Sequence, residues 1–395
     1  MVIRKPGYYD RFQCIAGACK DNCCIGWEID IDPERLEYYR HVPGELGRRL
    51  SSLIDRDRGC FILQGKEERC PFLNRDNLCD LILEIGEQAL CDICREHPRY
   101  YDWFPGLTEA GVGLCCEAAA RLILGSEEPV RFVTEESDGR DSNQDPEKRG
   151  VCGEKKKGNS ETRDMESALF EARETAFSIL QNRRNSVWVR LSILLSYMSE
   201  LQACIDFGSS DEILESAEYY REAESQNPDS ADFTAVITAE DANLCRELAG
   251  ELKSLEFMDP EWPEKLVCLD RFLMEPDQFR SVEQKIPVHD GVQEVVYEQI
   301  AVYFIYRYFM KCREDRDVIG KGQFAVFSVL MIRFLDLFRL HEQGTLTMED
   351  HVRNAVAYSK EIEYSEENME LLADKFISRE TVSTEVMNRI LHVVR

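Results

Sequence analysis

Apolar residues recur at the spacing of an α-helix through most of the chain beyond residue 165. The stretches that predict helices are residues 169–180, 186–204, 295–310 and 324–340, and two more helices are expected to open at Thr347 and Ser365. Residues 186–204 are apolar on nearly every side, which predicts a central position in the core. Because no stretch of useful length alternates between polar and apolar residues here, we expect an α-helical domain over residues 165–395.

Residues 1–125 show a different pattern, with short irregular segments and few long periodic runs. Two short helices are expected in this part. Asp32 suits the N-cap and Pro33 the first turn of one of them, and the alanine-rich residues 117–124 form the other. We therefore expect an irregular domain over residues 1–125, distinguished mainly by its cysteines.

The composition changes abruptly at residues 126–164, which carry almost no large apolar side chains and include three consecutive lysines at 155–157. Such a segment cannot bury a core, so we expect a polar, charged linker. The predicted fold class is mainly α, with an irregular cysteine-rich metal-binding N-terminal domain followed by an α-helical C-terminal domain.

Charge and hydropathy exclude several classes of protein. The formal net charge is −27, from 48 basic and 75 acidic residues, which disfavours a broad surface for DNA or RNA. The most apolar run, residues 324–340, contains Arg333, Asp336 and Arg339, and these charges suit one face of a soluble helix better than a bilayer. The N-terminus has no apolar signal-peptide region, so we expect a cytoplasmic protein without membrane contact.

Cysteines are concentrated near the N-terminus, where 11 of the 16 fall within residues 14–116. They are Cys14, Cys19, Cys23, Cys24, Cys60, Cys70, Cys79, Cys91, Cys94, Cys115 and Cys116. Thiols stay reduced in a cytosolic protein, so a dense group of them favours coordination of a soft metal over a disulfide framework. Burial as a small apolar residue is the alternative, and it suits the five dispersed cysteines of the C-terminal part better.

The spacing of these cysteines matches neither a simple zinc finger nor the ferredoxin pattern. Adjacent thiolates rarely bind one ion together, so the pairs Cys23–Cys24 and Cys115–Cys116 are each expected to give one residue to a centre. The other member then serves a second centre or packs in the core. The thiols suffice for one iron–sulfur cluster, and a second centre or a structural zinc would use the remainder.

Other cofactor signatures are weak. The sequence has no Walker loop and no Rossmann βαβ pattern, and the run from Cys19 to Cys24 departs by one gap from the three-cysteine motif of radical S-adenosylmethionine enzymes. Four tyrosines at helical spacing are interpreted as core rather than as a groove for a cationic substrate. These tyrosines are Tyr297, Tyr303, Tyr306 and Tyr308.

Four motifs of the cysteine-rich domain resemble the bacterial flagellin lysine N-methylase family. They read YYDxFxCIxGxCxDxCCIGWxIxID at residues 8–32, CPFLNxxxxC at 70–79, CRxxPR at 94–99 and CEAAARL at 116–122. The second and third are also similar to a wider set of cysteine domains that chelate zinc or iron. The resemblance covers residues 8–124, and beyond the linker it rests on chain length and helical character.

The resemblance implies transfer of methyl groups from S-adenosylmethionine to flagellin lysines, with a 4Fe–4S cluster carried by the cysteines. The cysteines that match the motifs are Cys14, Cys19, Cys23, Cys24, Cys70, Cys79, Cys94 and Cys116. Cys60, Cys91 and Cys115 are additional to the pattern, and the motif does not decide which four residues hold a cluster. Zinc is the alternative metal.

Two kinds of side chain near these cysteines suit methyl transfer. Arg95 or Arg99 could pair the carboxylate of S-adenosylmethionine, because a guanidinium matches a carboxylate with two hydrogen bonds. A structural ion pair is the alternative use of either arginine. A lysine amine must lose a proton before methylation, and the candidate acceptors are Tyr8, Tyr9, Asp21 and Glu117.

A different class of function stays open beside the enzyme. The cysteine-rich domain could be a non-enzymatic metal-chelating module or an iron–sulfur electron carrier, fused to a helical domain that binds a partner. Such a protein would neither bind S-adenosylmethionine nor label a protein substrate.

Overall fold

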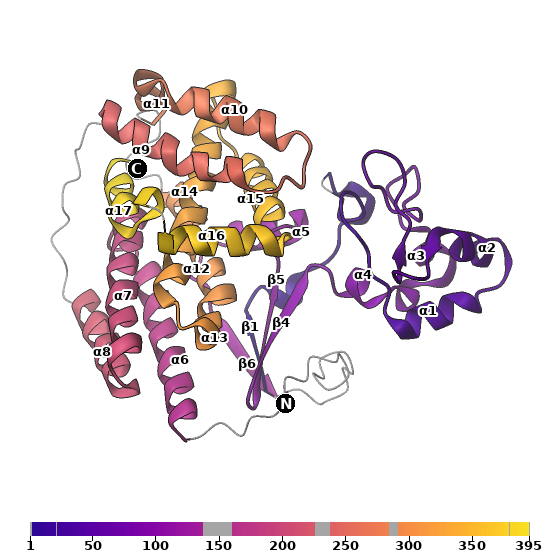
Figure 1. Cartoon of the computed structure of the whole chain (residues 1–395), viewed down its shortest axis with the longest axis horizontal. Coiled ribbons are helices and arrows are strands. Elements are labelled where there is room, and N and C mark those ends of the chain that lie inside the picture. Colours follow the sequence, from indigo (N-terminus) through magenta and orange to yellow (C-terminus); the bar gives the residue numbers. More distant parts are fainter. Residues whose placement is uncertain are drawn as a thin grey trace. The chain divides into compact units, whose positions relative to one another are not determined.

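The computed structural model of the 395-residue chain describes residues 2–20, 22–136, 160–225, 238–283, 291–378 and 380–394. The chain forms two compact units, whose main helices and strands are labelled in Figure 1. The N-terminal unit comprises Met1–Leu122 and Phe132–Asp141, and the helical unit comprises Ile123–Arg131 and Ser142–Arg395. The chain therefore enters the helical unit, returns to the N-terminal unit for a short segment, and then enters the helical unit again.

The helical unit confirms the predicted α-helical domain, although its first long helix begins at Ser160 rather than at residue 165. Its helices are α6 (Ser160–Leu180), α7 (Val187–Phe207), α8 (Ser210–Ser225), α9 (Ala239–Gly250), α10 (Trp262–Leu273), α11 (Pro276–Glu283), α12 (Gly291–Tyr308), α13 (Cys312–Asp315), α14 (Val318–Gln343), α15 (Met348–Glu363), α16 (Glu366–Ser378) and α17 (Thr384–Val393). Short 3-10 helices lie at Glu251–Ser254, Phe309–Lys311 and Glu380–Val382.

The core of the helical unit is built around α14, which packs against α7, α12, α15 and α16 (Figure 1). Asp317 caps its first turn by accepting a hydrogen bond from the Gly320 N–H at 2.9 Å, and Gly344 ends it in the left-handed backbone conformation. The contact of α12 with α14 confirms the predicted helix pair. The four tyrosines of α12 are buried, as their interpretation as core requires.

α14 is long and apolar enough to cross a membrane by length and composition, but 89% of its most apolar window is buried inside the protein. Two of its charges, expected on one face of a soluble helix, are fully buried. The guanidinium of Arg333 lies 5.3 Å from the ring centroid of Trp188. The Asp336 carboxylate lies 2.7 Å from His351 Nδ1 and accepts a hydrogen bond from Asn354 Nδ2 at 2.8 Å. α14 is thus a core helix whose buried charges have polar or aromatic partners.

The N-terminal unit contains a four-stranded sheet that the sequence did not predict. Its strands, in sheet order, are β4 (Arg99–Phe104), β5 (Leu107–Val112), β1 (Val2–Pro6) and β6 (Phe132–Glu136). β1 runs parallel to β5 and antiparallel to β6. β4 and β5 form a hairpin with a two-residue loop, in which Gly106 has a φ of +83° that favours glycine.

β6 corrects the predicted linker. Residues 132–136 pair with β1 along their whole length, so the segment that begins at residue 126 is not a linker throughout. The residues before β6 are also held, because Gln299 Nε2 donates hydrogen bonds to the carbonyls of Ser126 and Glu128. The rest of the predicted linker, residues 137–159 with its three lysines, lies outside the described residues.

The cysteine-rich part of the N-terminal unit is built from short elements, and those between residues 29 and 94 contribute to one hydrophobic cluster. The short elements are α1 (Pro33–Arg40), α2 (Gly44–Leu53), β2 (Ile54–Asp55), β3 (Cys60–Phe61), α3 (Asp80–Ile85), α4 (Asp92–Glu96) and α5 (Glu117–Leu124), with 3-10 helices at Tyr9–Arg11, Ala16–Ala18 and Glu87–Ala89. Asp32 caps α1 at the Arg35 N–H, as expected, and its second oxygen accepts a hydrogen bond from the Asp92 N–H at 2.9 Å. One carboxylate therefore fixes the starts of both α1 and α4.

Candidate metal centre

Five cysteines from distant parts of the sequence converge on the hydrophobic cluster of the N-terminal unit. This inner thiol group consists of Cys24, Cys70, Cys79, Cys91 and Cys94. Backbone contacts bring the segments together. The Cys70 N–H donates to the Cys24 carbonyl at 2.8 Å, and Cys79 forms a β-bridge with Leu73. Four of the five match the family motifs, and Cys91 is the addition.

Backbone N–H groups point at three sulfurs of the inner thiol group. Burial raises the pKa of Cys70 to about 12. The N–H groups of Phe72 and Leu73 hydrogen-bond to the Cys70 sulfur and act to lower this pKa. Burial likewise raises the pKa of Cys79, and hydrogen bonds from N–H groups of the following helix α3 act to lower it. A hydrogen bond with the Cys94 thiol lowers the pKa of Cys91, and the Cys94 N–H also bonds to the Cys91 sulfur. These N–H groups would stabilise thiolates if a metal displaced the protons.

Cys91 is a functional candidate that the motifs left aside. Its hydrogen bond with Cys94 raises the pKa of Cys94 well above its usual value, and burial and the nearby Cys24 and Cys70 thiols raise it further. The Cys91-x-x-Cys94 spacing was the signal, because it places two thiols on one helical turn. The structure therefore puts Cys91 among the potential ligands.

A second set of cysteines gathers where the N-terminal loop meets the start of α5. This outer thiol group consists of Cys14, Cys19, Cys23 and Cys116, of which Cys14 is exposed and the other three are half-buried. The Glu117 carboxylate accepts a hydrogen bond from the Lys20 N–H at 2.8 Å and one from the Cys19 thiol at 3.6 Å. Glu117 follows Cys116 directly in the sequence. Its carboxylate thus holds the loop that carries Cys19 at the start of α5.

The Cys116 sulfur faces the first turn of α5. Burial raises the pKa of Cys116 to about 11, the N–H groups of Ala119 and Ala118 oppose this shift, and the nearby Cys23 and Cys14 thiols add to it. The four sulfurs of the outer thiol group therefore come from one loop and one helix start. Two further cysteines of this unit, Cys60 and Cys115, are buried.

Within the described residues, no three His, Cys, Asp or Glu side chains lie close enough together to hold a single metal ion. An iron–sulfur cluster binds each cysteine through a different iron, so its thiolates stand further apart than the ligands of one ion. The donor set of the inner thiol group, with several convergent thiols and N–H groups aimed at sulfur, fits such a cluster in its chemistry.

The two arginines that were predicted to bind a cofactor have different surroundings. Arg95 pairs with Asp92 and Glu96 on α4, which agrees with the structural ion pair that was the alternative interpretation. The Arg99 guanidinium lies 5.0 Å from the ring centroid of Phe12 and 6.0 Å from that of Tyr9. Arg99 is therefore the better candidate for binding an anion.

The candidate proton acceptors also separate. Tyr8 is buried, and burial raises its pKa far above the usual range. Burial also raises the pKa of Tyr9. The Tyr9 hydroxyl lies 3.1 Å from the Tyr101 hydroxyl, which donates a hydrogen bond to the Glu96 carboxylate at 3.1 Å. The sequence did not predict this hydrogen-bonded series of Tyr9, Tyr101 and Glu96, because Tyr9 and Tyr101 are far apart in the sequence and come together only in the folded protein. Asp21 lies outside the described residues.

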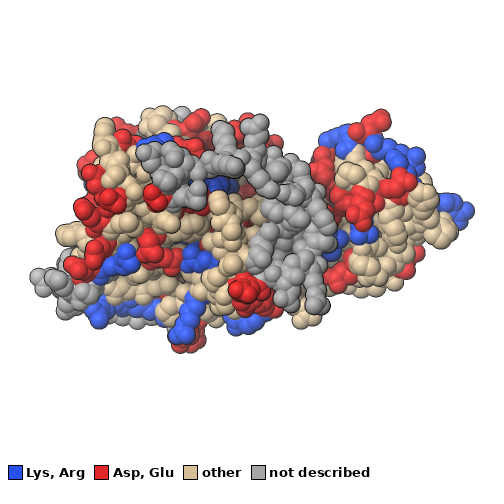
Figure 2. All heavy atoms as spheres, turned by 90° about the horizontal axis from the view of Figure 1, so that it is seen from below, with Lys and Arg blue, Asp and Glu red and all other residues tan. Residues whose placement is uncertain are grey.

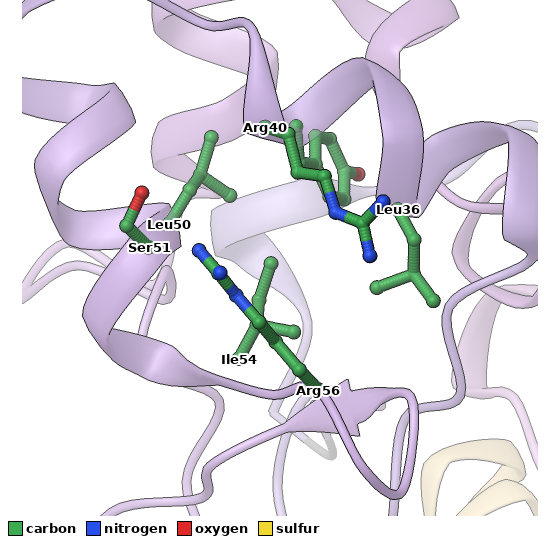
Figure 3. A pocket seen from close by; sticks show the side chains of 7 residues that line it. Leu36, Arg40, Leu50, Ser51, Ile54 and Arg56 are labelled. Carbon is green, nitrogen blue, oxygen red and sulfur yellow. The ribbon is translucent and has the colours of Figure 1, made fainter.

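A small pocket in the cysteine-rich part lies between α1, α2 and the residues after β2 (Figure 3). The side chains of Arg40 and Arg56 reach toward it, and Leu36, Leu50 and Ile54 line it. Its volume is about 20 Å³, room for a single water molecule. This pocket is too small for a nucleoside such as S-adenosylmethionine.

The helical unit matches the model of the FliB lysine N-methylase C-terminal domain over residues 173–388. The chain belongs to the FliB lysine N-methylase family. The matched residues lie outside residues 8–124, which carry the motifs of the cysteine-rich domain. The predicted family is thus confirmed by a separate part of the chain. No solved structure matches the chain significantly.

Curated relatives of the family share part of this chain. It is 26% identical over 131 residues to the Lysine-N-methylase of Salmonella typhimurium strain LT2, a match that covers 31% of this chain and 33% of that protein. It is 24% identical over 149 residues to the Flagellar biosynthetic protein FliU of Salmonella muenchen, covering 36% of this chain and 88% of that protein. The chain therefore matches about a third of the length of the FliB family methylase.

Proposed function

We propose that this chain is a cytoplasmic protein-lysine N-methyltransferase that modifies flagellin with S-adenosylmethionine and depends on a cysteine-ligated 4Fe–4S cluster. The observation that carries the proposal is the FliB-type helical unit in the same chain as the converging thiols. The names Lysine-N-methylase and Flagellar biosynthetic protein, given to the two relatives, support the reaction and the flagellar substrate.

In the proposed reaction the lysine Nζ forms a bond to the methyl carbon as the carbon–sulfur bond of the sulfonium breaks. The products are the methylated lysine, S-adenosylhomocysteine and one proton. A bound cluster would offer an iron with an open position to the amino and carboxylate groups of S-adenosylmethionine. Arg99 is the side chain proposed to pair that carboxylate.

The proton of the lysine amine needs an acceptor, and the chain from Tyr9 through Tyr101 to Glu96 is proposed for this role. The Tyr9 oxygen would accept the proton while its own passes to Tyr101, and Tyr101 would pass a proton to the Glu96 carboxylate. Glu117 suits the role less, because its oxygens already accept hydrogen bonds from Arg121, Lys20 and Cys19.

The net charge of the chain favours encounter with a lysine-bearing protein through long-range attraction. On the face shown in Figure 2, acidic and basic side chains are interspersed over the helical unit. The attraction would therefore be general, and the site itself must select the lysine.

The test is transfer of a labelled methyl group from S-adenosylmethionine to purified flagellin by the full chain, isolated without oxygen. We expect labelled lysine in the parent, and loss of both label and metal in Cys23→Ser and Cys70→Ser. Cys204→Ser and Cys312→Ser, in the helical unit, serve as controls that keep both. If no protein is labelled by any of them, a metal-chelating or electron-carrying module replaces the enzyme.

Metal analysis of the same preparation tests the cluster. We expect a brown protein with iron and acid-labile sulfide, because thiolate-to-iron charge transfer absorbs across the visible range. A colourless protein that carries zinc alone would contradict the iron–sulfur cluster.

A further inference from the structure

We propose that the solvent-exposed face of α8 is a docking surface for a lysine-rich, amphipathic segment of a partner protein. α8 packs against α6 and α7, and its remaining face is open to solvent (Figure 1). The docking surface is argued from the helical unit alone. Only the identification of the partner as the methylation substrate rests on the proposed function.

A row of carboxylates runs along the exposed face of α8. Asp211, Glu215, Glu218 and Glu222 follow each other at intervals of three or four residues, which places them on one side of the helix, and all four are exposed. We call these four residues the acidic stripe. Like charges at this spacing repel each other, and Glu222 lies in the last turn, where the helix dipole disfavours a negative charge. The acidic stripe therefore lowers the stability of the free helix, and a basic partner would relieve the repulsion.

The chain supplies little positive charge to the acidic stripe. The sequence of α8 contains one basic residue, Arg221, whose guanidinium pairs with Glu171 of α6 at 3.5 Å and donates to the Ala217 carbonyl at 3.3 Å. Among the residues that the structure describes, the carboxylates of Glu215 and Glu218 have no hydrogen-bond donor and no cation beside them. These two carboxylates are therefore available to cations of another molecule.

Two open hollows adjoin the acidic stripe. One has a volume of about 440 Å³, lies between α7 and α8, and is lined by Glu215 and Tyr219 together with other residues of the two helices. The other has a volume of about 500 Å³ and is lined by Leu214 and by charged residues of α8 that include Glu218. Tyr219 is 64% exposed and Leu214 is 38% exposed. Each hollow thus joins carboxylates to a large apolar side chain, which suits the ammonium and the aliphatic stem of a lysine.

The charge of this surface decides which partner fits. The acidic stripe repels nucleic acid and an anionic membrane surface. A second copy of the chain, packed through the same face, would bring like charges together. A metal ion needs convergent ligands, and in the described part of the chain no three His, Cys, Asp or Glu side chains are placed to hold one. The complementary partner is a polypeptide segment with lysines spaced along it and apolar residues between them.

The test measures binding of a fluorescein-labelled peptide of lysines and leucines at helical spacing to the full chain, by fluorescence anisotropy. Glu215→Gln with Glu218→Gln removes two carboxylates of the acidic stripe, and Tyr219→Ser removes the aromatic wall of one hollow. Glu366→Gln with Glu367→Gln is the matched control, because both glutamates are exposed on α16 and the change of charge is the same. Far-UV circular dichroism shows whether each variant stays folded.

We expect Glu215→Gln with Glu218→Gln to weaken peptide binding by about three- to tenfold at low salt. This difference should shrink as the salt concentration rises, because salt screens exposed charges. Tyr219→Ser should weaken binding at every salt concentration, and the control pair should bind as the parent does. A peptide with glutamates in place of its lysines should not bind.

Two results would overturn the docking surface. The first is equal peptide affinity in the Glu215→Gln, Glu218→Gln variant and in the control pair. The second is a parent that dimerises in sedimentation experiments and loses its dimer in the Glu215→Gln, Glu218→Gln variant, because a second copy of the chain would then be the occupant.

Methyl transfer to flagellin separates this inference from the proposed function. Docking contacts are the same in the ground state and the transition state, so Glu215→Gln with Glu218→Gln should raise the KM for flagellin and leave kcat unchanged. A parent that binds the peptide as expected but transfers no methyl group contradicts the methyltransferase and leaves the docking surface standing. A parent that methylates flagellin, while the variant keeps both its KM and its peptide affinity, contradicts the docking surface and leaves the enzyme standing.

Discussion

The Glu117 carboxylate accepts a hydrogen bond from the backbone N–H of Lys20 at 2.8 Å, although 97 positions separate the two residues in the sequence. Burial acts to raise the pKa of Glu117, but hydrogen bonds from Arg121 and from the Lys20 N–H outweigh it, and the pKa is lowered. The ionised carboxylate is therefore the form that joins the N-terminal loop to α5.

Replacement of this carboxylate should loosen the outer thiol group. In Glu117→Ala the Lys20 N–H and the Arg121 guanidinium lose their acceptor, and we expect the free energy of unfolding to fall by about 1–3 kcal/mol. The variant should also lose its proposed cysteine-bound metal to a chelator in solution faster than the parent, because Glu117 no longer holds the loop with Cys19 at the start of α5. Glu87→Ala, at an exposed carboxylate of the same unit, should leave both measurements unchanged. Equal rates of metal loss in parent and Glu117→Ala would show that this contact does not support the group.

A buried ion pair should dominate the stability of the helical unit. Glu298 on α12 is fully buried and accepts hydrogen bonds from Arg190 at 2.6 Å and from Arg183 at 2.8 Å. Glu298→Gln leaves the buried Arg190 charge with only the more distant Glu294 carboxylate, at 3.8 Å, and we expect a loss of about 3 kcal/mol in urea unfolding. Glu240→Gln, which removes the exposed partner of Arg389, is the matched control and should change little. Equal effects of the two substitutions would contradict this difference between buried and exposed pairs.

Glu361 should give the stability of the chain a distinct dependence on pH. Burial raises the pKa of Glu361 from 4.5 to about 7. Hydrogen bonds from the Met258 and Asp259 N–H groups act to lower this pKa but do not outweigh burial. Between these two values the folded chain holds a proton that the unfolded chain releases, so stability falls as the pH rises through this window. Glu361→Gln should remove up to about 1.4 kcal/mol per pH unit of that slope in denaturant titrations.

Asp350 provides the control for this pH dependence, because it acts in another window. Burial acts to raise its pKa, but hydrogen bonds from Thr347 and Arg339 outweigh it and lower the pKa below 3.8. Its contribution is present above pH 3.8 and is lost as the pH falls through the lowered value. Asp350→Asn should therefore change the profile in acid and not between pH 4.5 and 7. Superimposable profiles of the parent and Glu361→Gln across that range would refute the assignment to Glu361.

Two glycine substitutions should act with opposite signs. A Cβ added to Gly47 would lie 1.8 Å from the Val42 carbonyl oxygen, so Gly47→Ala should cost about 1–3 kcal/mol despite the higher helix propensity of alanine. A Cβ on Gly250 would meet no atom within 4 Å, so Gly250→Ala should stabilise by about 0.4–1 kcal/mol. Calorimetry of both variants measures the signs. A stabilised Gly47→Ala would mean that α2 can move away from Val42.

Helices were predictable here because their periodicity is local. The stripes of α12 and α14, and the N-cap of α1 at Asp32, lie within a few residues in the sequence. The sheet was missed because its strands are five or six residues long and because its central strand β1 pairs with β5 and β6, which are far away in the sequence. All six residues of β4 are half-buried, so no alternation marks it.

The chemistry of the thiols was predictable from their density, but their grouping was not. Cys23 and Cys24 are neighbours in the sequence and belong to different groups, whereas Cys19 and Cys116 share one group through Glu117. Spacing along the chain cannot reveal a contact of this kind. Arg95 shows a different limit, because its partners Asp92 and Glu96 are close to it in the sequence but the short helix α4 that carries all three was not predicted.

The return of the chain for β6 has a consequence for protein synthesis. β1 lies between β5 and β6, so until residue 136 has left the ribosome one edge of β1 exposes unpaired N–H and C=O groups. Such an edge is a template for pairing with another chain. A fragment that stops at residue 125 keeps that edge permanently and should aggregate, whereas one that continues through Glu136 carries its own covering strand.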